Sequence, residues 1–275
     1  VARARGAGLA RVVCIGLWRA PGQFGNALDL AAGDPSFFSA TAGVHPHDCA
    51  RVPEEDWERL ERLARDPRVV GVGETGLDFH YDHSPRPAQE AAFRRSIALA
   101  RRCEKPVVVH VREADEACAR ILREEGVPPA GGVIHCFTGD ARAARAYLDL
   151  GLFLSVAGVV TFKAADALRE AVRRVPRDRL LVETDCPYLA PQSRRGRRNE
   201  PSFVAEVAAA LGYSFASSTI ATLVCALFGV PLAYALALAL TAVMAWGAGA
   251  ETSPSAGDSA RGATRGLRWG LAAYF

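Results

Sequence analysis

The sequence of 275 residues predicts an α/β protein built on a (β/α)₈ barrel. Two observations predict this fold. Short apolar runs alternate with amphipathic stretches along most of the chain, and four of the apolar runs end in a side chain that can bind a metal. Such a barrel typically needs about 250 residues in one domain. Half of the residues are hydrophobic, which is enough for one large core.

The apolar runs have the length and composition of strands that are buried on both faces. They are short and rich in Val, Ile or Leu, as parallel strands covered by helices are. A closed barrel needs eight strands, and the sequence contains seven candidates. Because the site chemistry favours a barrel over an open sheet, we predict that a first strand is missing. The predicted strands are residues 12–16, 38–44, 69–74, 107–110, 132–135, 152–156 and 180–183.

Helical patterns lie between these strands. Their apolar residues recur at spacings of three and four, with Arg and Glu on the opposite face. Gly126 and Gly212 stand where two of the helices should end. Alternation of strands and helices implies a parallel sheet. The predicted helices are residues 53–65, 88–103, 114–125, 140–150, 164–174 and 202–211.

Composition narrows the class of protein only slightly. The net charge of +3 is too small to argue for nucleic acid binding by itself. Without a CxxC pair, the cysteines argue against a disulfide framework and against a cysteine zinc site. No secretory signal follows the first residues, so we expect a cytoplasmic protein. The seven cysteines are Cys14, Cys49, Cys103, Cys118, Cys136, Cys186 and Cys225.

The chain changes character after residue 212, where the predicted barrel domain of residues 1–212 ends. Residues 214–250 carry no charged side chain. We therefore predict an apolar helical segment over 213–250 that is a transmembrane candidate, with membrane association through 214–246. A buried helical hairpin on the barrel is the alternative. Residues 251–275 are predicted to form a disordered tail.

Four polar side chains stand at the carboxyl ends of predicted strands. In a barrel these ends converge at one mouth, where catalytic residues lie. Two imidazoles and two carboxylates suit a divalent ion such as Mg²⁺, Mn²⁺ or Zn²⁺. A ligating carboxylate can also take the proton from an attacking water, so Asp185 and Glu74 are candidate catalytic residues. The predicted metal ligands are Glu74, His110, His135 and Asp185.

Further candidates follow the same strands. His45 and His47 lie on an extended segment, which points both rings to one side. We predict that His45 contacts substrate, and His47 fits a metal or a phosphate equally well. Arg112 could hold a phosphate or carboxylate in a bidentate fork. An ion pair with Glu113 or Asp115 is the alternative for this arginine.

Aromatic and basic residues near the predicted mouth suit nucleic acid. Tyr81, Phe137 and Tyr188 could stack on bases, although packing is the commoner role of such rings. Residues 194–199 form a basic loop that could contact phosphates. A solvated charge run is the alternative for this loop.

The sequence segments around these candidate residues together resemble the TatD family of metal-dependent deoxyribonucleases. The resemblance covers residues 4–212 and implies hydrolysis of phosphodiester bonds in DNA from the 3′ end, with divalent ions. It places Glu74, His110, His135 and Asp185 on metal positions, and His45 and Arg112 near phosphate positions. We expect a monomer acting on DNA. The matching strings are GVHPHD (43–48), GETGLDFHYD (73–82), KPVVVHVREA (105–114), GVIHCFTGD (132–140) and LLVETDCPYLAP (180–191).

Two departures from the family stand out. Most members open with a strand that ends in a His-x-His pair, which is absent here and agrees with the count of seven strands. Residues 217–234 resemble the first span of a transporter permease, and this join indicates a frameshift or a fusion.

Two other interpretations of the protein's function remain open. One is a small-molecule amidohydrolase on the same barrel. It is disfavoured because Lys105 and Lys163 do not end strands. The other is an inactive, membrane-tethered barrel.

Overall fold

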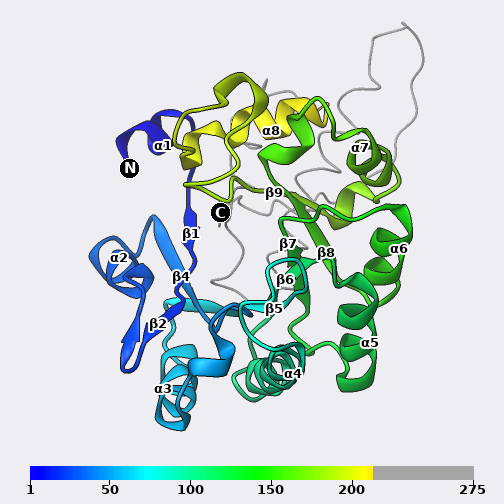
Figure 1. Ribbon diagram of the computed structural model, residues 1–275. Coiled ribbons are helices and arrows are strands. Elements are labelled where there is room, and N and C mark those ends of the chain that lie inside the picture. Colours follow the sequence, from blue (N-terminus) through cyan, green and yellow to red (C-terminus); the bar gives the residue numbers. More distant parts are fainter. Residues whose placement is uncertain (213–275) are drawn as a thin grey trace, which may run out of the picture.

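The computed structural model describes residues 1–212, in which seven parallel strands form one curled sheet (Figure 1). The two edge strands, β1 and β9, are not hydrogen-bonded to each other, so the described residues form an open half-barrel. The seven predicted strands are confirmed, while the missing first strand stays a prediction. The strands are β1 (Val12–Cys14), β4 (Phe38–Ala42), β5 (Val69–Asp78), β6 (Val107–Arg112), β7 (Gly132–His135), β8 (Phe153–Val156) and β9 (Leu180–Val182).

Helices connect successive strands and lie on the outside of the curled sheet (Figure 1). Their apolar stripes supply fully buried side chains, such as Leu60, Phe93 and Ile121, which pack in the same core cluster as the strands. Burial of each such side chain contributes roughly 1.5–3 kcal/mol. The helices are α3 (Glu54–Ala64), α4 (Arg86–Arg102), α5 (Asp115–Glu125), α6 (Ala141–Asp149) and α7 (Asp166–Arg173), and α8 (Val204–Ala210) follows the last strand, β9.

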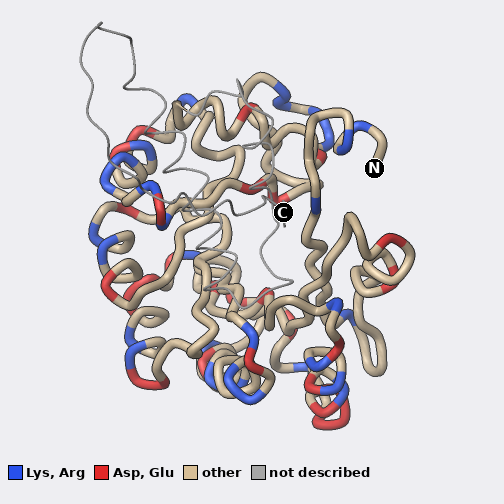
Figure 2. Tube along the Cα trace, turned by 180° about the vertical axis from the view of Figure 1, so that it is seen from behind, with Lys and Arg blue, Asp and Glu red and all other residues tan. Residues whose placement is uncertain are grey.

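Charged side chains of both signs lie along these outer helices (Figure 2). Several pair between neighbours. Arg120 of α5 binds Glu90 of α4 at 2.9 Å, and Arg102 of α4 binds Glu61 of α3 at 2.6 Å. The outer surface therefore has the mixed charge that the composition indicates.

The part of the chain before β4 contains elements that were not predicted. A hairpin of β2 (Trp18–Ala20) and β3 (Gln23–Phe24) precedes α2 (Ala27–Gly33), and α1 (Ala2–Gly6) opens the chain. The buried carboxylate of Asp56 in α3 anchors the hairpin. It accepts hydrogen bonds from Trp18 Nε1 at 2.7 Å and from the Gly22 amide at 2.8 Å.

The predictions for the end of the chain fall outside the described residues. These are the apolar helical segment 213–250, membrane association through 214–246 and the disordered tail 251–275. Within residues 1–212, no helix is both long enough and apolar enough to cross a membrane.

Candidate metal centre

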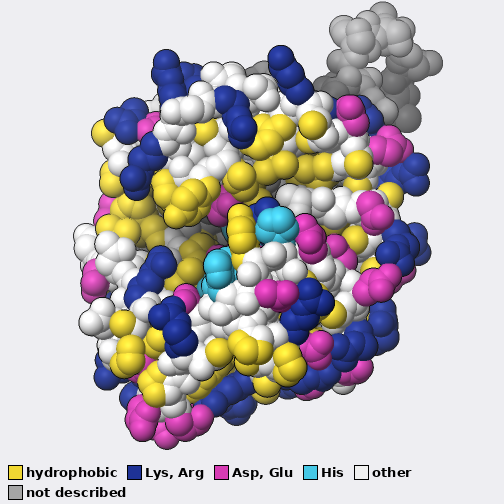
Figure 3. Space-filling view, viewed as in Figure 1, with side chains coloured by type: hydrophobic (Ala, Val, Ile, Leu, Met, Phe, Trp, Pro, Cys, Tyr) yellow, Lys and Arg dark blue, Asp and Glu magenta, His cyan; other side chains and the backbone are white. Residues whose placement is uncertain are grey.

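A cavity of about 1380 Å³ opens at the carboxyl ends of the parallel strands. In the space-filling view, histidine side chains lie at the edge of the hollowed face (Figure 3). The structure brings all six predicted site residues into the lining of this cavity. They are Glu74, His110, His135, Asp185, His45 and Arg112.

Glu74 lies at the centre of the group because β5 bulges at this residue. Gly73 pairs with Val108 and Thr75 with Val109, which leaves Glu74 as the extra residue of β5. A bulge of this kind redirects a side chain, here toward the cavity. The carboxylate is buried, at 8% exposure.

Three imidazoles surround one carboxylate oxygen of Glu74. His110 Nδ1 lies 2.9 Å from Oε1, His135 Nε2 lies 3.6 Å away and His45 Nε2 lies 3.7 Å away. Burial alone would raise the pKa of Glu74, but the three imidazoles outweigh burial and hold this pKa well below its usual range. Glu74 is therefore a carboxylate at neutral pH, as a metal ligand must be.

His110 bridges two buried carboxylates. Its Nδ1 donates to Glu74, and its Nε2 donates to Asp78 Oδ2 at 3.1 Å. Burial would lower the pKa of His110, but the hydrogen bonds to Asp78 and Glu74 outweigh it and raise the pKa to about 9. Asp78 also accepts the backbone amide of Tyr81 at 2.9 Å. Sequence reasoning missed Asp78, which lies in the last position of β5.

His135 is oriented by a second carboxylate that was not predicted, Glu183. Its Nδ1 donates to Glu183 Oε2 at 2.8 Å, while Glu183 Oε1 accepts the Cys136 amide at 2.6 Å. The other nitrogen of His135, Nε2, therefore faces Glu74 and lies 3.5 Å from Asp185 Oδ1. The signal in the sequence is the spacing of two between Glu183 and Asp185.

Asp185 completes the predicted set, just after β9. Burial raises its pKa above the ordinary value, partly offset by the neighbouring His135. Its carboxylate contacts His135 Nε2, whereas His110 contacts Glu74. The four predicted ligands thus form a chain of contacts in which Glu74 touches both histidines.

His45 is close enough to be a ligand, but its hydrogen bonding favours a donor. His45 forms, with Glu74 and His110, a group of mutually close residues that could hold a metal. Burial lowers the pKa of His45 to about 4, so the ring is neutral at pH 7. Its Nδ1 accepts the His47 amide at 3.2 Å. In a neutral ring the proton then sits on Nε2, which points into the site as a donor.

The residues present suit a divalent metal ion. Nitrogen and carboxylate donors together fit Zn²⁺ or Mn²⁺, and Mg²⁺ accepts such carboxylates. Two of the histidines also carry a feature of metal-bound imidazoles. His110 and His135 each donate their outer N–H to a buried carboxylate, which fixes the ring. Burial raises the pKa of the neighbouring Cys136 thiol well above the usual range, so this thiol is protonated at neutral pH.

Arg112 does not form the ion pairs that were its alternative role. Glu113 accepts instead from His80 Nδ1 at 2.7 Å, and Asp115 accepts from the Tyr147 hydroxyl at 2.9 Å. The Arg112 guanidinium lies over the ring of Tyr81, 4.8 Å from its centroid. Within the described residues, no carboxylate pairs with it, so its donors can meet a ligand in the cavity.

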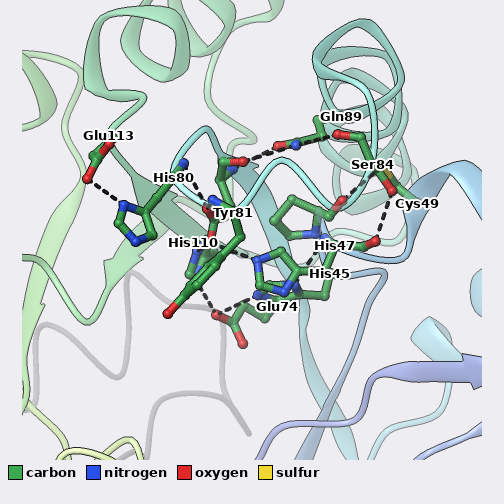
Figure 4. A network of polar contacts seen from close by, with 12 residues as sticks. His45, His47, Cys49, Glu74, His80, Tyr81, Ser84, Gln89, His110 and Glu113 are labelled. Atoms are coloured by element: carbon green, nitrogen blue, oxygen red, sulfur yellow. Dashed lines mark hydrogen bonds and ion pairs between the residues drawn. The ribbon is translucent and has the colours of Figure 1, made fainter.

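Gln89 of α4 is hydrogen-bonded to the last residue of β5 (Figure 4). The fully buried side-chain amide of Gln89 accepts a hydrogen bond from the Asp78 backbone N–H at 2.8 Å. It also donates a hydrogen bond to the Asp78 backbone carbonyl at 3.0 Å. It also donates to the Ser84 carbonyl at 2.8 Å, and Ser84 in turn donates to the His47 carbonyl. His47 itself donates to Asp78 at 2.8 Å. The network thus fixes Asp78 between His47 and His110.

The remaining candidates divide into buried and exposed groups. Phe137 is buried at 2% exposure, so it packs in the core and the stacking role considered for it is wrong. Tyr81 and Tyr188 are exposed and line the cavity. In the basic loop, Arg194 pairs with Glu206 at 2.7 Å, and Arg195 lies over the ring of Phe162.

Comparisons with known proteins agree with this fold. A family model described as TatD related DNase matches residues 1–216. The uncharacterized metal-dependent hydrolase YabD of Bacillus subtilis is 42% identical over 208 residues, which are 76% of this chain and 80% of YabD. The 3′-5′ ssDNA/RNA exonuclease TatD of Edwardsiella piscicida is 43% identical over 213 residues, covering 76% of this chain and 81% of that protein.

The crystal structure of YJJV, a TatD homolog from Escherichia coli, has a TM-score of 0.71 at 30% identity and covers 76% of this chain and 80% of that chain. The fold and the site thus define a metal-dependent hydrolase with a TIM-barrel-like architecture. More narrowly, the chain belongs to the TatD family.

Proposed function

We propose that the protein hydrolyses phosphodiester bonds of single-stranded DNA, removing nucleotides from the 3′ end. The observation that carries this proposal is the convergence of His45, His110 and His135 on the buried Glu74 carboxylate. The unpaired guanidinium of Arg112 in the same cavity suits the charge of a phosphate. Relatives that bear the name 3′-5′ ssDNA/RNA exonuclease support the substrate class.

The residues that would hold a divalent ion are Glu74, His110, His135 and Asp185. When bound, such an ion supplies positive charge that stabilises the transition state of phosphodiester hydrolysis. Asp185 and Glu74 would also take the proton from the attacking water. Burial raises the pKa of Asp185, which makes this carboxylate the stronger base of the two.

Two hydrogen-bond donors would hold the phosphate, the neutral ring of His45 and the cationic guanidinium of Arg112. His45 presents Nε2–H because its Nδ1 already accepts a backbone amide. Arg112 can offer two parallel N–H groups to the phosphate oxygens. Asp78 and Glu183 fix the rings of His110 and His135, so these histidines need not reorganise during the reaction.

The test uses the full chain, a 5′-labelled single-stranded DNA and Mg²⁺ or Mn²⁺. We expect a ladder of products that shorten from the 3′ end. Asp185→Asn should abolish turnover, since it removes both a ligand and a base. Asp149→Asn on α6 is the matched control and should retain full activity, because Asp149 pairs only with the exposed Arg145. If Mg²⁺, Mn²⁺ and Zn²⁺ all fail to release nucleotides, the proposed function is wrong.

The amidohydrolase alternative gains no support from the lysines. Lys105 precedes β6, at the end of the strand away from the cavity, and neither Lys105 nor Lys163 lines the cavity. A lysine that bridges ions is therefore not available among residues 1–212.

A further inference from the structure

Two exposed tyrosines face the same cavity. Among the described residues, the exposed large hydrophobic side chains are Val1, Leu30, Tyr81 and Tyr188. Only the two tyrosines are aromatic, and both line the cavity that holds the candidate metal centre. Aromatic rings with one apolar face and a polar tip are enriched where proteins bind partners. The placement of both rings at one cavity therefore points to a ligand with flat, apolar faces.

The ring of Tyr81 already packs against other side chains of the protein. His83 stacks parallel to its ring, with centroids 5.5 Å apart and an interplanar angle of 2°. The guanidinium of Arg112 lies over the same ring at 4.8 Å. Tyr81 thus supports Arg112, and a ligand ring would have to displace one of these neighbours.

Tyr188 differs from Tyr81 in this respect. Its side chain is 71% exposed, against 50% for Tyr81. Within residues 1–212, no aromatic ring and no cation stacks on it. The part of the chain that the structure describes therefore leaves this ring face open to a ligand in the cavity.

The backbone that carries Tyr188 is held in place by a buried side chain. Asn199, at 3% exposure, donates to the Tyr188 carbonyl at 2.6 Å and to the Thr184 carbonyl at 2.7 Å. The backbone N–H of Asn199 also donates a hydrogen bond to the Pro187 carbonyl at 3.1 Å. The Tyr188 amide in turn donates to the Asp185 carbonyl at 3.0 Å, which links the tyrosine to a predicted ligand. An aromatic ring held on a fixed loop loses little entropy when a ligand binds.

We propose that Tyr188 is a stacking platform for one nucleobase of a single-stranded nucleic acid, beside the phosphate that Arg112 and His45 would hold. This inference rests on the proposed function and names a subsite for it. Stacking on a ring tolerates every base, because each base has a flat face. A base within a duplex is already stacked on both sides, so this subsite favours single strands and frayed ends.

The experiment measures binding of the full chain to labelled single-stranded DNA with phosphorothioate linkages, by fluorescence anisotropy in Mg²⁺. One strand carries all its bases, and a series carries a single abasic nucleotide at successive positions from the 3′ end. Tyr188→Leu should weaken binding of the complete strand about 5-fold to 100-fold, the range for loss of one stacked base. Tyr188→Phe should bind like the unmodified protein, because it keeps the ring.

The abasic series identifies stacking specifically. At the position whose base lies on Tyr188, the abasic strand should bind the unmodified protein weakly and should lose less than about 2-fold further with Tyr188→Leu. Leu30→Ala, which truncates an exposed side chain of α2, is the control. It should bind every strand with the same affinity as the unmodified protein.

Three results would overturn the inference. Equal loss with every strand would mean that Tyr188→Leu disturbs the loop or a phosphate contact, and no loss would mean that the ring contacts no base. In both cases the unmodified protein still binds and cleaves DNA, so the proposed function stands. If the unmodified protein neither binds nor cleaves DNA, the proposed function fails and the inference fails with it.

Discussion

The buried carboxylates Glu183 and Asp78 determine which nitrogen of each neighbouring histidine is free. Glu183 accepts from His135 Nδ1, so Nε2, the atom that faces Glu74 and Asp185, is the nitrogen left for an ion. Asp78 accepts from His110 Nε2, so an ion would take the place of the proton that Nδ1 donates to Glu74. The site therefore depends on residues that would not touch the ion themselves.

Replacing Glu183 by Gln should weaken divalent ion binding about 10-fold to 100-fold. The amide of Gln can donate to His135 Nδ1, which moves the ring proton to the nitrogen that faces the centre. Isothermal titration of the metal-stripped full chain with Zn²⁺ or Mn²⁺ measures this change. Glu170→Gln, on the exposed face of α7, is the control. Unchanged affinity in Glu183→Gln would show that the carboxylate does not orient a ligand.

The four predicted ligands could be read from the sequence because strand ends are visible in it. An apolar run that stops at a His, Glu or Asp marks both the strand and the direction of its side chain. Asp78 was missed because it lies beyond the predicted strand 69–74, and Glu183 was missed because the sequence points to Asp185, two residues further on, as the ligand at that strand end. Only the packing of β5 against β6, and of β7 against the segment after β9, shows that they meet histidines.

At the scale of elements, α4 and β5 build the site together. β5 is buried along all ten of its residues, and its glycines allow close approach of neighbouring strands. A Cβ at Gly76 would collide with the His110 carbonyl, and this residue has a φ of +135°. Gly76 therefore allows β5 and β6 to pack closely.

Replacing Gln89 by Met should lower the free energy of unfolding by about 2–4 kcal/mol, because buried backbone groups of Asp78 and Ser84 lose their partners. Met has a similar volume, so packing changes little. Urea denaturation measures the difference, and Glu90→Gln in α4, which alters only a surface ion pair with Arg120, should stay within about 0.5 kcal/mol. A Gln89→Met protein as stable as the unmodified one would mean that other groups satisfy the end of β5.

The elements that sequence reasoning missed share a physical cause. The hairpin β2–β3 and the helix α2 are short, and local propensity is weak in short elements. The hairpin depends on a distant partner, the carboxylate of Asp56 in α3, which no local pattern reveals. The long, strongly periodic helices α3 to α6 were predicted within about two residues of their ends.

At the scale of the whole molecule, the two ends of the described chain meet. Arg3 in α1 donates to Glu200, which lies beyond β9 in the sequence, with an N–O distance of 2.8 Å. This contact joins the side of β1 to the side of β9, the two edges that the sheet leaves unpaired. The hydrogen bond from Arg3, aided by one from Ser202, lowers the pKa of Glu200 to about 2.

The lowered pKa predicts a pH dependence of stability. A carboxyl whose pKa is lower in the folded state stabilises the protein above its unfolded pKa, and this stabilisation is lost as the pH falls toward the folded pKa. Between pH 5 and 3, Glu200→Gln should therefore lose less stability than the unmodified protein. The difference should be small, because Arg3 is largely exposed. Urea denaturation at successive pH values measures it, and parallel curves would contradict the prediction.

The order of the strands has a consequence for protein synthesis. Glu74 and His110 leave the ribosome well before Asp185, which follows the last strand of the sheet. A nascent chain that has exposed only β1 to β8 holds two histidines and one carboxylate of the proposed centre, without the carboxylate proposed as its stronger base. The proposed centre is therefore complete only after translation has passed β9.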